Sequence, residues 1–220
     1  MATGEVTLGA SDGVLTQAPA VTPASALPEG GLVAQCRAGD PDAFARLVAL
    51  HERTVFNLAF RLIGDPEEAR DVSQDVFLQV FRKLPRFEGR SSLKTWIYRI
   101  VVNQCYNRQR WWRRRRKDRA RPLEELTAAD EMRMSESGSG APDPYEELRR
   151  REAKRAVQAA LLQVSFEHRA ILLLREVEGL SVQQVAESLG LPQGTVKSRL
   201  SRAREALRQS LVAAANGGRP

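Results

Sequence analysis

The feature that most constrains this chain is an abrupt change of charge near its middle. Residues 106–121 contain nine cations and a single acid, and residues 122–147 contain eight acids and a single cation. The acidic stretch also runs Ser-Glu-Ser-Gly-Ser-Gly-Ala-Pro over residues 135–142. A segment of this composition cannot bury an apolar core. The sequence therefore predicts two small domains, over residues 31–117 and 144–212, joined by a flexible acidic linker over residues 118–143.

The apolar pattern predicts an all-α fold. Large apolar residues recur every three or four positions in both predicted domains, and no stretch alternates as a strand would. Asp40-Pro41 and Asp65-Pro66 each place an N-cap before a proline that opens a helix, and Gly64 is predicted to end the first of these helices. Each domain is therefore expected to be a small helical unit.

The second predicted domain contains a helix-turn-helix pattern. Ser181 and Gln184 have capping-box spacing, Gly190 marks a tight turn, and a last helix is predicted from Thr195 to Leu211. Cations at the start of that last helix would reach base edges, and later ones would reach phosphates. The alternative is an amphipathic helix pair with a solvated basic face, and the spacing favours DNA binding.

The third predicted helix of the first domain interleaves aromatic, cationic and amide side chains, and Ser91 or Ser92 is predicted to cap it. Trp111-Trp112 then leads into the run of arginines. Aromatic rings that stack on unpaired bases, with arginine on phosphates, suit single-stranded nucleic acid. Trp96 alone fits the core equally well. For the whole basic segment, nucleic acid is favoured over a merely solubilising face.

Composition narrows the class of protein and its location. The formal net charge of +7 indicates a polyanionic partner, either nucleic acid or an anionic membrane. No apolar run approaches the roughly 18 residues that span a bilayer, so no membrane insertion is expected. Residues 1–30 contain no Lys or Arg and are predicted to be a disordered tail rather than a secretory signal. Residues 213–220 are predicted to form a frayed tail.

No constellation of residues supports enzyme chemistry. The sequence has no glycine-rich phosphate loop and no glycine-flanked nucleophile, and both histidines lie far from either cysteine. No catalytic residue, metal or cofactor is therefore predicted. Cys36 and Cys105 are too few for a disulfide framework, which favours a reducing cytoplasm, and both are expected to be inert rather than redox switches.

Two groups of motifs resemble bacterial sigma factors. Asp-Val-Ser-Gln-Asp-Val-Phe-Leu at 71–78 and Phe-Glu-Gly-Arg-Ser-Ser-Leu-Lys-Thr-Trp-Ile-Tyr-Arg-Ile at 87–100 are similar to sigma domain two. Glu-Val-Glu-Gly-Leu-Ser at 176–181 and the segment at 185–207 are similar to sigma domain four. With two domains and a linker only, the chain resembles the extracytoplasmic-function (ECF) group of the sigma-70 family.

The resemblance implies a non-catalytic initiation factor that binds core RNA polymerase and directs it to promoters. One helix would dock on the coiled coil of the largest polymerase subunit, and the second domain would meet the flap of the second subunit. The residues implied at the coiled coil are Asp71, Gln74, Asp75, Leu78 and Phe81. Without the resemblance, Asp71, Gln74, Asp75, Leu78 and Gln79 are best interpreted as a solvated helix face, and Phe81 belongs to the apolar stripe of the same helix.

The resemblance also implies two promoter contacts. Stacking and phosphate contacts would offset the cost of opening the minus-ten element, and the helix-turn-helix would bind the minus-thirty-five element as duplex. The implied minus-ten residues are Phe87, Arg90, Ser91, Ser92, Lys94, Trp96, Arg99 and Asn103. The implied minus-thirty-five residues are Thr195, Lys197, Ser198, Arg199, Arg202 and Arg204.

Two further expectations come with the family. The acidic linker would pass through the polymerase and mimic nucleic acid there, and an anti-sigma protein is an expected partner. Ser73 departs from the aliphatic residue usual at its position.

The alternative function is a free-standing helix-turn-helix regulator that binds duplex DNA without polymerase, which leaves the pattern of the first domain unexplained.

Overall fold

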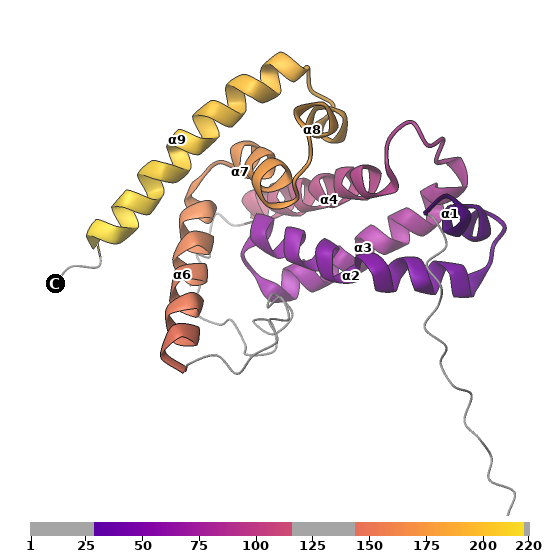
Figure 1. The fold of residues 1–220 in the computed structure, drawn as a ribbon, viewed down its shortest axis with the longest axis horizontal. Coiled ribbons are helices and arrows are strands. Elements are labelled where there is room, and N and C mark those ends of the chain that lie inside the picture. The colour runs from indigo at the N-terminus through magenta and orange to yellow at the C-terminus, as the bar shows by residue number, and fades with distance from the viewer. Residues whose placement is uncertain (1–28, 116–143, 218–220) are drawn as a thin grey trace, which may run out of the picture.

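The structure, a computed structural model, describes residues 29–115 and 144–217 (Figure 1). Every regular element in these two ranges is helical, as the apolar pattern predicts. The predicted linker lies outside the described residues, and so does the predicted amino-terminal tail except for its last two residues, which open the first helix.

The first described range folds into four α-helices and one short 3₁₀ turn, here called the amino-terminal bundle. Its elements are α1 (Glu29–Arg37), α2 (Pro41–Ile63), α3 (Pro66–Lys83), η1 (Leu84–Arg86) and α4 (Leu93–Arg115). Helix α2 packs against both α3 and α4, and α1 lies across the start of α2.

The predicted helix boundaries of the bundle follow from caps. Asp40 accepts hydrogen bonds from the backbone N–H groups of Asp42 and Ala43, at 2.9 and 3.2 Å, and so opens α2. Gly64 ends α2 in the left-handed conformation, with φ of 85°. Asp65 then accepts from Glu68 N at 3.1 Å and opens α3. These starts and this end are confirmed.

The second described range forms the carboxy-terminal group. Its elements are α6 (Pro144–Gln163), α7 (Phe166–Leu172), the π-helical turn η2 (Leu173–Val177), α8 (Val182–Leu189) and α9 (Gln193–Gly217). Helix α9 continues as far as Gly217, beyond its predicted end, and so includes most of the predicted frayed tail. Residues 213–215 are alanines, which are the strongest helix formers, and this explains the extension.

The two halves are packed against each other rather than separate. Helix α8 packs on α4, and α6 and α7 meet the end of α2 (Figure 1). Buried apolar side chains of both halves belong to one continuous cluster, which includes Leu58 and Tyr98 of the bundle and Ile171 of the carboxy-terminal group. The sequence predicted the two helical units but not this contact between them.

Candidate nucleic-acid interfaces

A row of exposed side chains runs along one side of α3. The row consists of the five residues that the resemblance assigned to polymerase, Asp71, Gln74, Asp75, Leu78 and Phe81. Leu78 is 52% exposed and Phe81 is 60% exposed, although both are large and apolar. The opposite side of α3 is buried in the core. Exposed apolar side chains beside acids are typical of an interaction surface.

The first acid of the row is already paired inside the molecule. Arg108 of α4 places Nη2 3.0 Å from Asp71 Oδ2, and its Nε lies 2.6 Å from Glu68 Oε2. Asp71 is thus fixed in position and partly neutralised. Asp75 has no cation within ion-pair distance among the described residues. Its charge is the one that the row offers to a partner.

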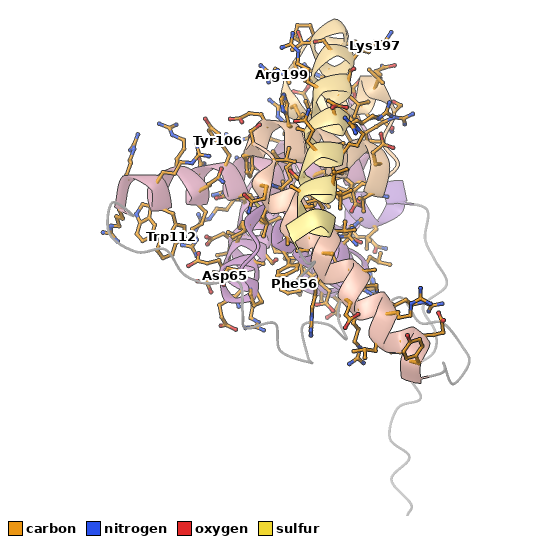
Figure 2. The ribbon with its side chains drawn as sticks, turned by 90° about the vertical axis from the view of Figure 1, so that its left-hand side faces the viewer. Phe56, Asp65, Tyr106, Trp112, Lys197 and Arg199 are labelled. Carbon is orange, nitrogen blue, oxygen red and sulfur yellow. The ribbon has the colours of Figure 1, made fainter. Side chains whose placement is uncertain are left out.

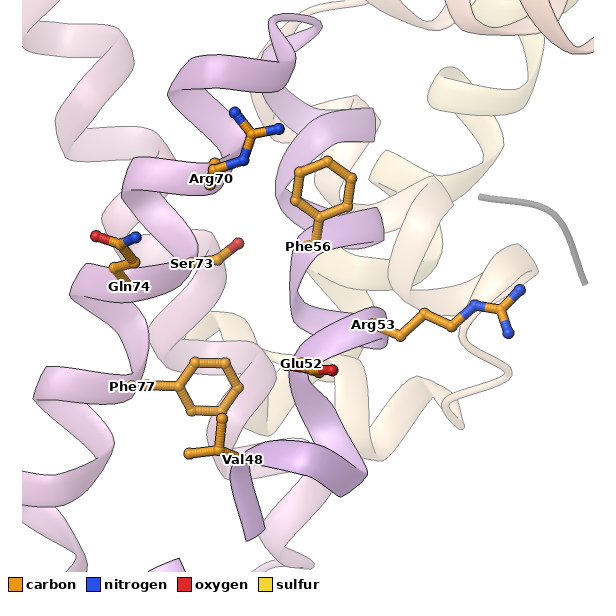
Figure 3. Close-up of a pocket in the computed structure, with 8 residues that line it drawn as sticks. All are labelled: Val48, Glu52, Arg53, Phe56, Arg70, Ser73, Gln74 and Phe77. Atoms are coloured by element: carbon orange, nitrogen blue, oxygen red, sulfur yellow. The ribbon is translucent and has the colours of Figure 1, made fainter. Parts of the chain in front are cut away.

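A groove of about 460 Å³ lies beside this row, between α2 and α3. Figure 3 shows Val48 and Phe77 toward one end of it, Phe56 and Arg70 toward the other, and Ser73 between them. The Ser73 hydroxyl donates a hydrogen bond of 2.6 Å to Ala69 O within α3. This bond satisfies the buried hydroxyl at the position where Ser73 departs from an aliphatic residue.

The segment between α3 and α4 brings the first predicted minus-ten residues together. The rings of Phe87 and Trp96 pack with their centroids 5.0 Å apart, and both side chains are half-buried. Arg37 of α1 donates to Phe87 O at 2.7 Å and holds the loop against the bundle. Ser92 Oγ accepts from Thr95 N at 3.1 Å, which confirms the predicted cap of α4. Phe87 and Trp96 therefore support the loop as well as bordering solvent.

The other predicted minus-ten residues lie on the exposed side of this segment, except Ser91, which is half-buried. Arg90 pairs with Glu88 at 2.5 Å, and Lys94 Nζ lies 5.5 Å from the centre of the Tyr98 ring. Arg99 and Asn103 follow one turn apart along α4, and both are exposed. This places two polar side chains side by side on the open face of the helix.

Helix α8 covers part of the minus-ten segment. A pocket of about 300 Å³ is lined by Arg90, Ser91, Thr95, Trp96 and Arg99 from the bundle and by Glu187 and Ser188 from α8. Ser188 Oγ donates to Thr95 O at 3.4 Å. The predicted helix-turn-helix thus lies directly on the predicted minus-ten surface.

Helices α8 and α9 form the predicted helix-turn-helix. Ser181 Oγ accepts from Gln184 N at 3.1 Å and Gln184 Oε1 accepts from Ser181 N at 2.8 Å, so the capping box is confirmed. Gly190 ends α8 with φ of 64°, and Leu191 N donates to Ala186 O at 3.0 Å. This turn sets the direction in which α9 leaves.

The predicted minus-thirty-five residues do not all share one face of α9. Helical spacing groups Thr195, Ser198, Arg199 and Arg202, and places Lys197 and Arg204 on the other flank. Figure 2 shows Lys197 and Arg199 projecting to opposite sides of the helix. Arg204 bonds Glu176 of η2, with Nε at 3.0 Å and Nη2 at 2.6 Å from the same oxygen. Arg204 therefore ties α9 to η2.

Arg169 of α7 is a structural residue that sequence reasoning missed. Only 4% exposed, it donates to Leu62 O of α2 and, at 3.0 and 2.9 Å, to Leu162 O and Val164 O at the end of α6. Burial, together with the nearby charge of Arg113, lowers the Arg169 pKa to about 10, so it stays charged near neutral pH. The only sequence signal is a cation directly before an apolar run.

Two further polar contacts join the halves. Tyr98 OH donates to Glu178, and Gln158 Nε2 donates to Phe60 O at 3.2 Å. Burial, reinforced by the bond to Glu178, raises the pKa of Tyr98 well above its ordinary value, so Tyr98 remains a neutral donor. No sequence spacing links these residues, which are 80 or more positions apart.

Neither cysteine has the setting of a reactive thiol. Cys105 is buried, and this burial raises its pKa far above the ordinary value. Cys36 is partly exposed, and desolvation followed by the charge of Asp40 raises its pKa as well. Raised pKa values oppose the thiolate form that reacts. Among the described residues, no three His, Cys, Asp or Glu side chains form a metal-binding group, and no helix could span a membrane.

Known proteins match both halves of the chain. Residues 47–119 match the family model for Sigma-70 region 2, and residues 154–207 match that for Sigma-70 region 4. The RNA polymerase sigma-H factor of Pseudomonas aeruginosa is 34% identical over 183 residues, which cover 82% of this chain and 92% of that protein. The chain belongs to the sigma-70 family of RNA polymerase sigma factors. This sigma factor is of the ECF type.

Two other relatives support that assignment. The ECF sigma factor SigW of Bacillus subtilis is 28% identical over 179 residues, covering 81% of this chain and 94% of SigW. The solved structure of CnrH with the cytosolic domain of CnrY superposes with a TM-score of 0.58 at 25% identity, covering 83% of this sigma factor and 96% of CnrH. A free-standing regulator is not favoured, because the region 2 match includes both the α3 row and α4.

Proposed function

We propose that this sigma factor binds core RNA polymerase through the α3 row and the adjoining groove. The observation that carries the proposal is the exposure of Leu78 and Phe81 beside Asp75. A partner helix placed there would bury two apolar side chains and meet one carboxylate that has no internal partner among the described residues. Apolar anchors with a charged rim are typical of protein interfaces.

The first half of α4 is the proposed minus-ten surface. Arg99 and Asn103 offer a cation and an amide on its open face, and the Phe87–Trp96 pair supports the loop beside them. An amide can bond the edge of an unstacked base, and arginine can bond its phosphate. These contacts would stabilise the melted strand without any catalytic step.

The proposed minus-thirty-five surface is the face of α9 that holds Thr195, Ser198, Arg199 and Arg202. Hydroxyl groups and guanidinium groups at the start of a recognition helix bond base edges and phosphates in the major groove. Lys197 lies on the other flank and is suited to a phosphate. Because Arg204 is bonded to Glu176 within the molecule, Arg204 is less available for a DNA contact than the other predicted residues.

The two halves must separate before both promoter elements are bound. The elements lie about 25 base pairs apart, which is roughly 85 Å of duplex at about 3.4 Å per pair. Here Ser188 of α8 bonds Thr95 of α4 at 3.4 Å, so the helix-turn-helix is held against the proposed minus-ten segment and cannot span that distance. The arrangement in Figure 1 is therefore the form of the free protein, and it opens on the polymerase.

Other partners follow from relatives and from the family. The solved structure of the sigma factor RpoE from Bartonella quintana is a complex with the anti-sigma factor NepR. We infer that an anti-sigma protein also binds this chain, and that its binding site is the groove between α2 and α3. The carboxy-terminal group would meet the polymerase flap, the acidic linker would enter the enzyme, and all of this would take place in the cytoplasm.

The test compares two leucines of similar exposure. Leu78→Asp places a charge in the α3 row, whereas Leu50→Asp, at a residue 66% exposed on α2, lies two residues from Val48 and Glu52 and so faces away from the groove. We expect Leu78→Asp to weaken co-elution with core polymerase at least tenfold and Leu50→Asp to leave it unchanged. Equal affinities for the two variants would contradict the proposed surface.

A further inference from the structure

The loop between α3 and α4 presents several of the proposed minus-ten residues, yet its own backbone does little to hold it. The bonds between backbone groups that involve residues 87–92 join Phe87 N to Leu84 O and Trp96 N to Ser92 O, each at 3.0 Å. Both lie at the ends of the loop, and Gly89 turns between them with φ of 73°. Contacts from other elements must therefore fix the path of this loop.

One such contact comes from the first helix. Arg37, the last residue of α1, donates from Nη2 to Phe87 O at 2.7 Å and to Pro85 O at 3.4 Å. A single guanidinium nitrogen thus meets two carbonyls that come just before the turn of the loop. Figure 1 shows α1 beside the end of α3, where it contacts η1.

Helix α1 is anchored, so Arg37 starts from a fixed base. Leu32 and Val33 are buried in the core cluster, and Asp40 N donates to Gln35 O at 3.2 Å where the chain turns into α2. A guanidinium is rigid and planar, so its bond from an anchored helix fixes the direction of the carbonyl that it meets. Helix α1 precedes residues 47–119, so this contact lies partly outside the segment that matches region 2.

The Phe87 carbonyl is placed to control the shape of the proposed minus-ten surface. The Phe87 ring packs on Trp96 with centroids 5.0 Å apart, and Glu88, the next residue, pairs with Arg90. Turning the peptide between Phe87 and Glu88 would move both pairs. A loop that is already ordered loses less conformational freedom when it binds. The bond from Arg37 therefore favours capture of an unpaired strand.

We propose that Arg37 is a positioning residue for the minus-ten surface. It holds the loop over residues 87–92 in the shape that binds the melted strand, and it acts through the Phe87 carbonyl rather than on DNA. The proposal rests on the function proposed above for this surface. A positioning role predicts weaker strand binding without the loss of a phosphate contact, so the dependence of binding on salt separates the two.

The experiment measures binding of the holoenzyme to a single-stranded minus-ten oligonucleotide from a promoter that the wild type transcribes. The test variant is Arg37→Gln. The matched control is Arg46→Gln, which removes the same charge and a bond of 2.8 Å to Gln35 of α1 but touches no loop residue. We expect Arg37→Gln to weaken strand binding about three- to tenfold, with an unchanged slope of log K against log salt. Arg46→Gln should stay within about twofold of the wild type.

A spectroscopic measurement follows the loop directly. In a Trp111→Phe/Trp112→Phe background, Trp96 is the remaining tryptophan. Loss of the Arg37 bond should loosen Phe87 from Trp96, so the Trp96 emission should shift to longer wavelength and acrylamide should quench it more strongly. Arg46→Gln should leave both signals unchanged. Arg37 is exposed, so core polymerase affinity and the midpoint of thermal unfolding should also stay unchanged.

Each contrary result has its own meaning. Wild-type strand affinity for Arg37→Gln would overturn the proposal. A slope shallower by about 0.7 would make Arg37 a direct phosphate contact on the single strand and would also overturn it. Equal losses for Arg37→Gln and Arg46→Gln, or a lower unfolding midpoint for Arg37→Gln alone, would leave Arg37 a merely structural role. A wild-type protein that fails to bind core polymerase or the strand would instead refute the proposed function.

Discussion

The interior of the amino-terminal bundle and the junction between the two halves are built differently. Inside the bundle, Leu47, Leu58 and Leu62 of α2 are fully buried, and α2 packs against both α3 and α4. At the junction, several contacts are hydrogen bonds, and their donors include the buried guanidinium of Arg169. The bundle interior is held by exclusion of water, whereas the junction combines the continuous apolar cluster with paired polar groups.

This difference suggests how the two halves would separate, as proposed above, while each half stays folded. Opening the bundle would expose apolar surface to water, which costs about 25 cal/mol of free energy per Å² and forms no new favourable contacts. Opening the junction returns Arg169, Gln158 and Tyr98 to water, which offers each of them new hydrogen bonds, so the net loss per bond is only about 1 kcal/mol. The junction, where part of the contact is polar, is therefore the place where we expect the molecule to open first.

The largest effect is expected inside the bundle. Leu58 is fully buried, so Leu58→Ala should lower the free energy of unfolding by about 2 to 5 kcal/mol through lost burial and the cavity left behind. Leu50, on the same helix but 66% exposed, is the control, and Leu50→Ala should change stability by less than about 0.5 kcal/mol. Urea unfolding measures both. Similar losses of unfolding free energy for the two variants would show that burial of Leu58 does not stabilise the bundle.

The next effect concerns the junction. Arg169→Met removes the donor to Leu62 O across the junction, together with the donors to Leu162 O and Val164 O within the carboxy-terminal group. It should favour separation of the halves by about 2 kcal/mol while the bundle stays folded. Spin labels at residues 83 and 209, in a Cys36→Ser background, should then report longer distances between the halves.

The control for Arg169 is another arginine that bonds a carbonyl. Arg175 Nη1 donates to Leu180 O at 2.8 Å, but both residues lie in the carboxy-terminal group. Arg175→Met should leave the distance between the labels as in the wild type. If Arg169→Met does the same, Arg169 does not hold the junction.

The smallest effect is expected for a single hydroxyl. Tyr98→Phe keeps the buried ring and removes only the bond to Glu178, so it should favour separation by about 0.5 to 1.5 kcal/mol, read by the same labels. Glu178→Ala should produce a similar shift, and the double variant should add little to either. Fully additive shifts would show that the two residues act independently.

Local signals account for what the sequence predicted, and distant contacts account for what it missed. Asp40, Asp65 and the Ser181–Gln184 box fix helix starts through neighbours three residues away, so they are visible in the sequence. Helix α1 was missed because its segment has two glycines and no capping residue ahead of it. The pairing of Arg204 with Glu176 joins residues 28 positions apart, which no spacing reveals.

The candidate sites also differ in how far the sequence alone predicted them. The α3 row has ordinary helical spacing, and only the resemblance to sigma factors separated it from a solvated face. The helix-turn-helix was evident from its cap and turn alone. The junction was not predicted, because Arg169 acts on Leu62, which lies 107 residues earlier in the chain.

The donors and acceptors of the junction differ in how evolution can change them. Phe60, Leu62 and Thr95 of the bundle each contribute a backbone oxygen, which every amino acid supplies, so drift in their side chains leaves the acceptors in place. Gln158, Arg169 and Ser188 contribute side-chain donors that one nucleotide change can delete. Substitutions that weaken or strengthen the junction should therefore accumulate mainly in the carboxy-terminal group; Tyr98 of the bundle, whose side chain donates to Glu178, is the exception.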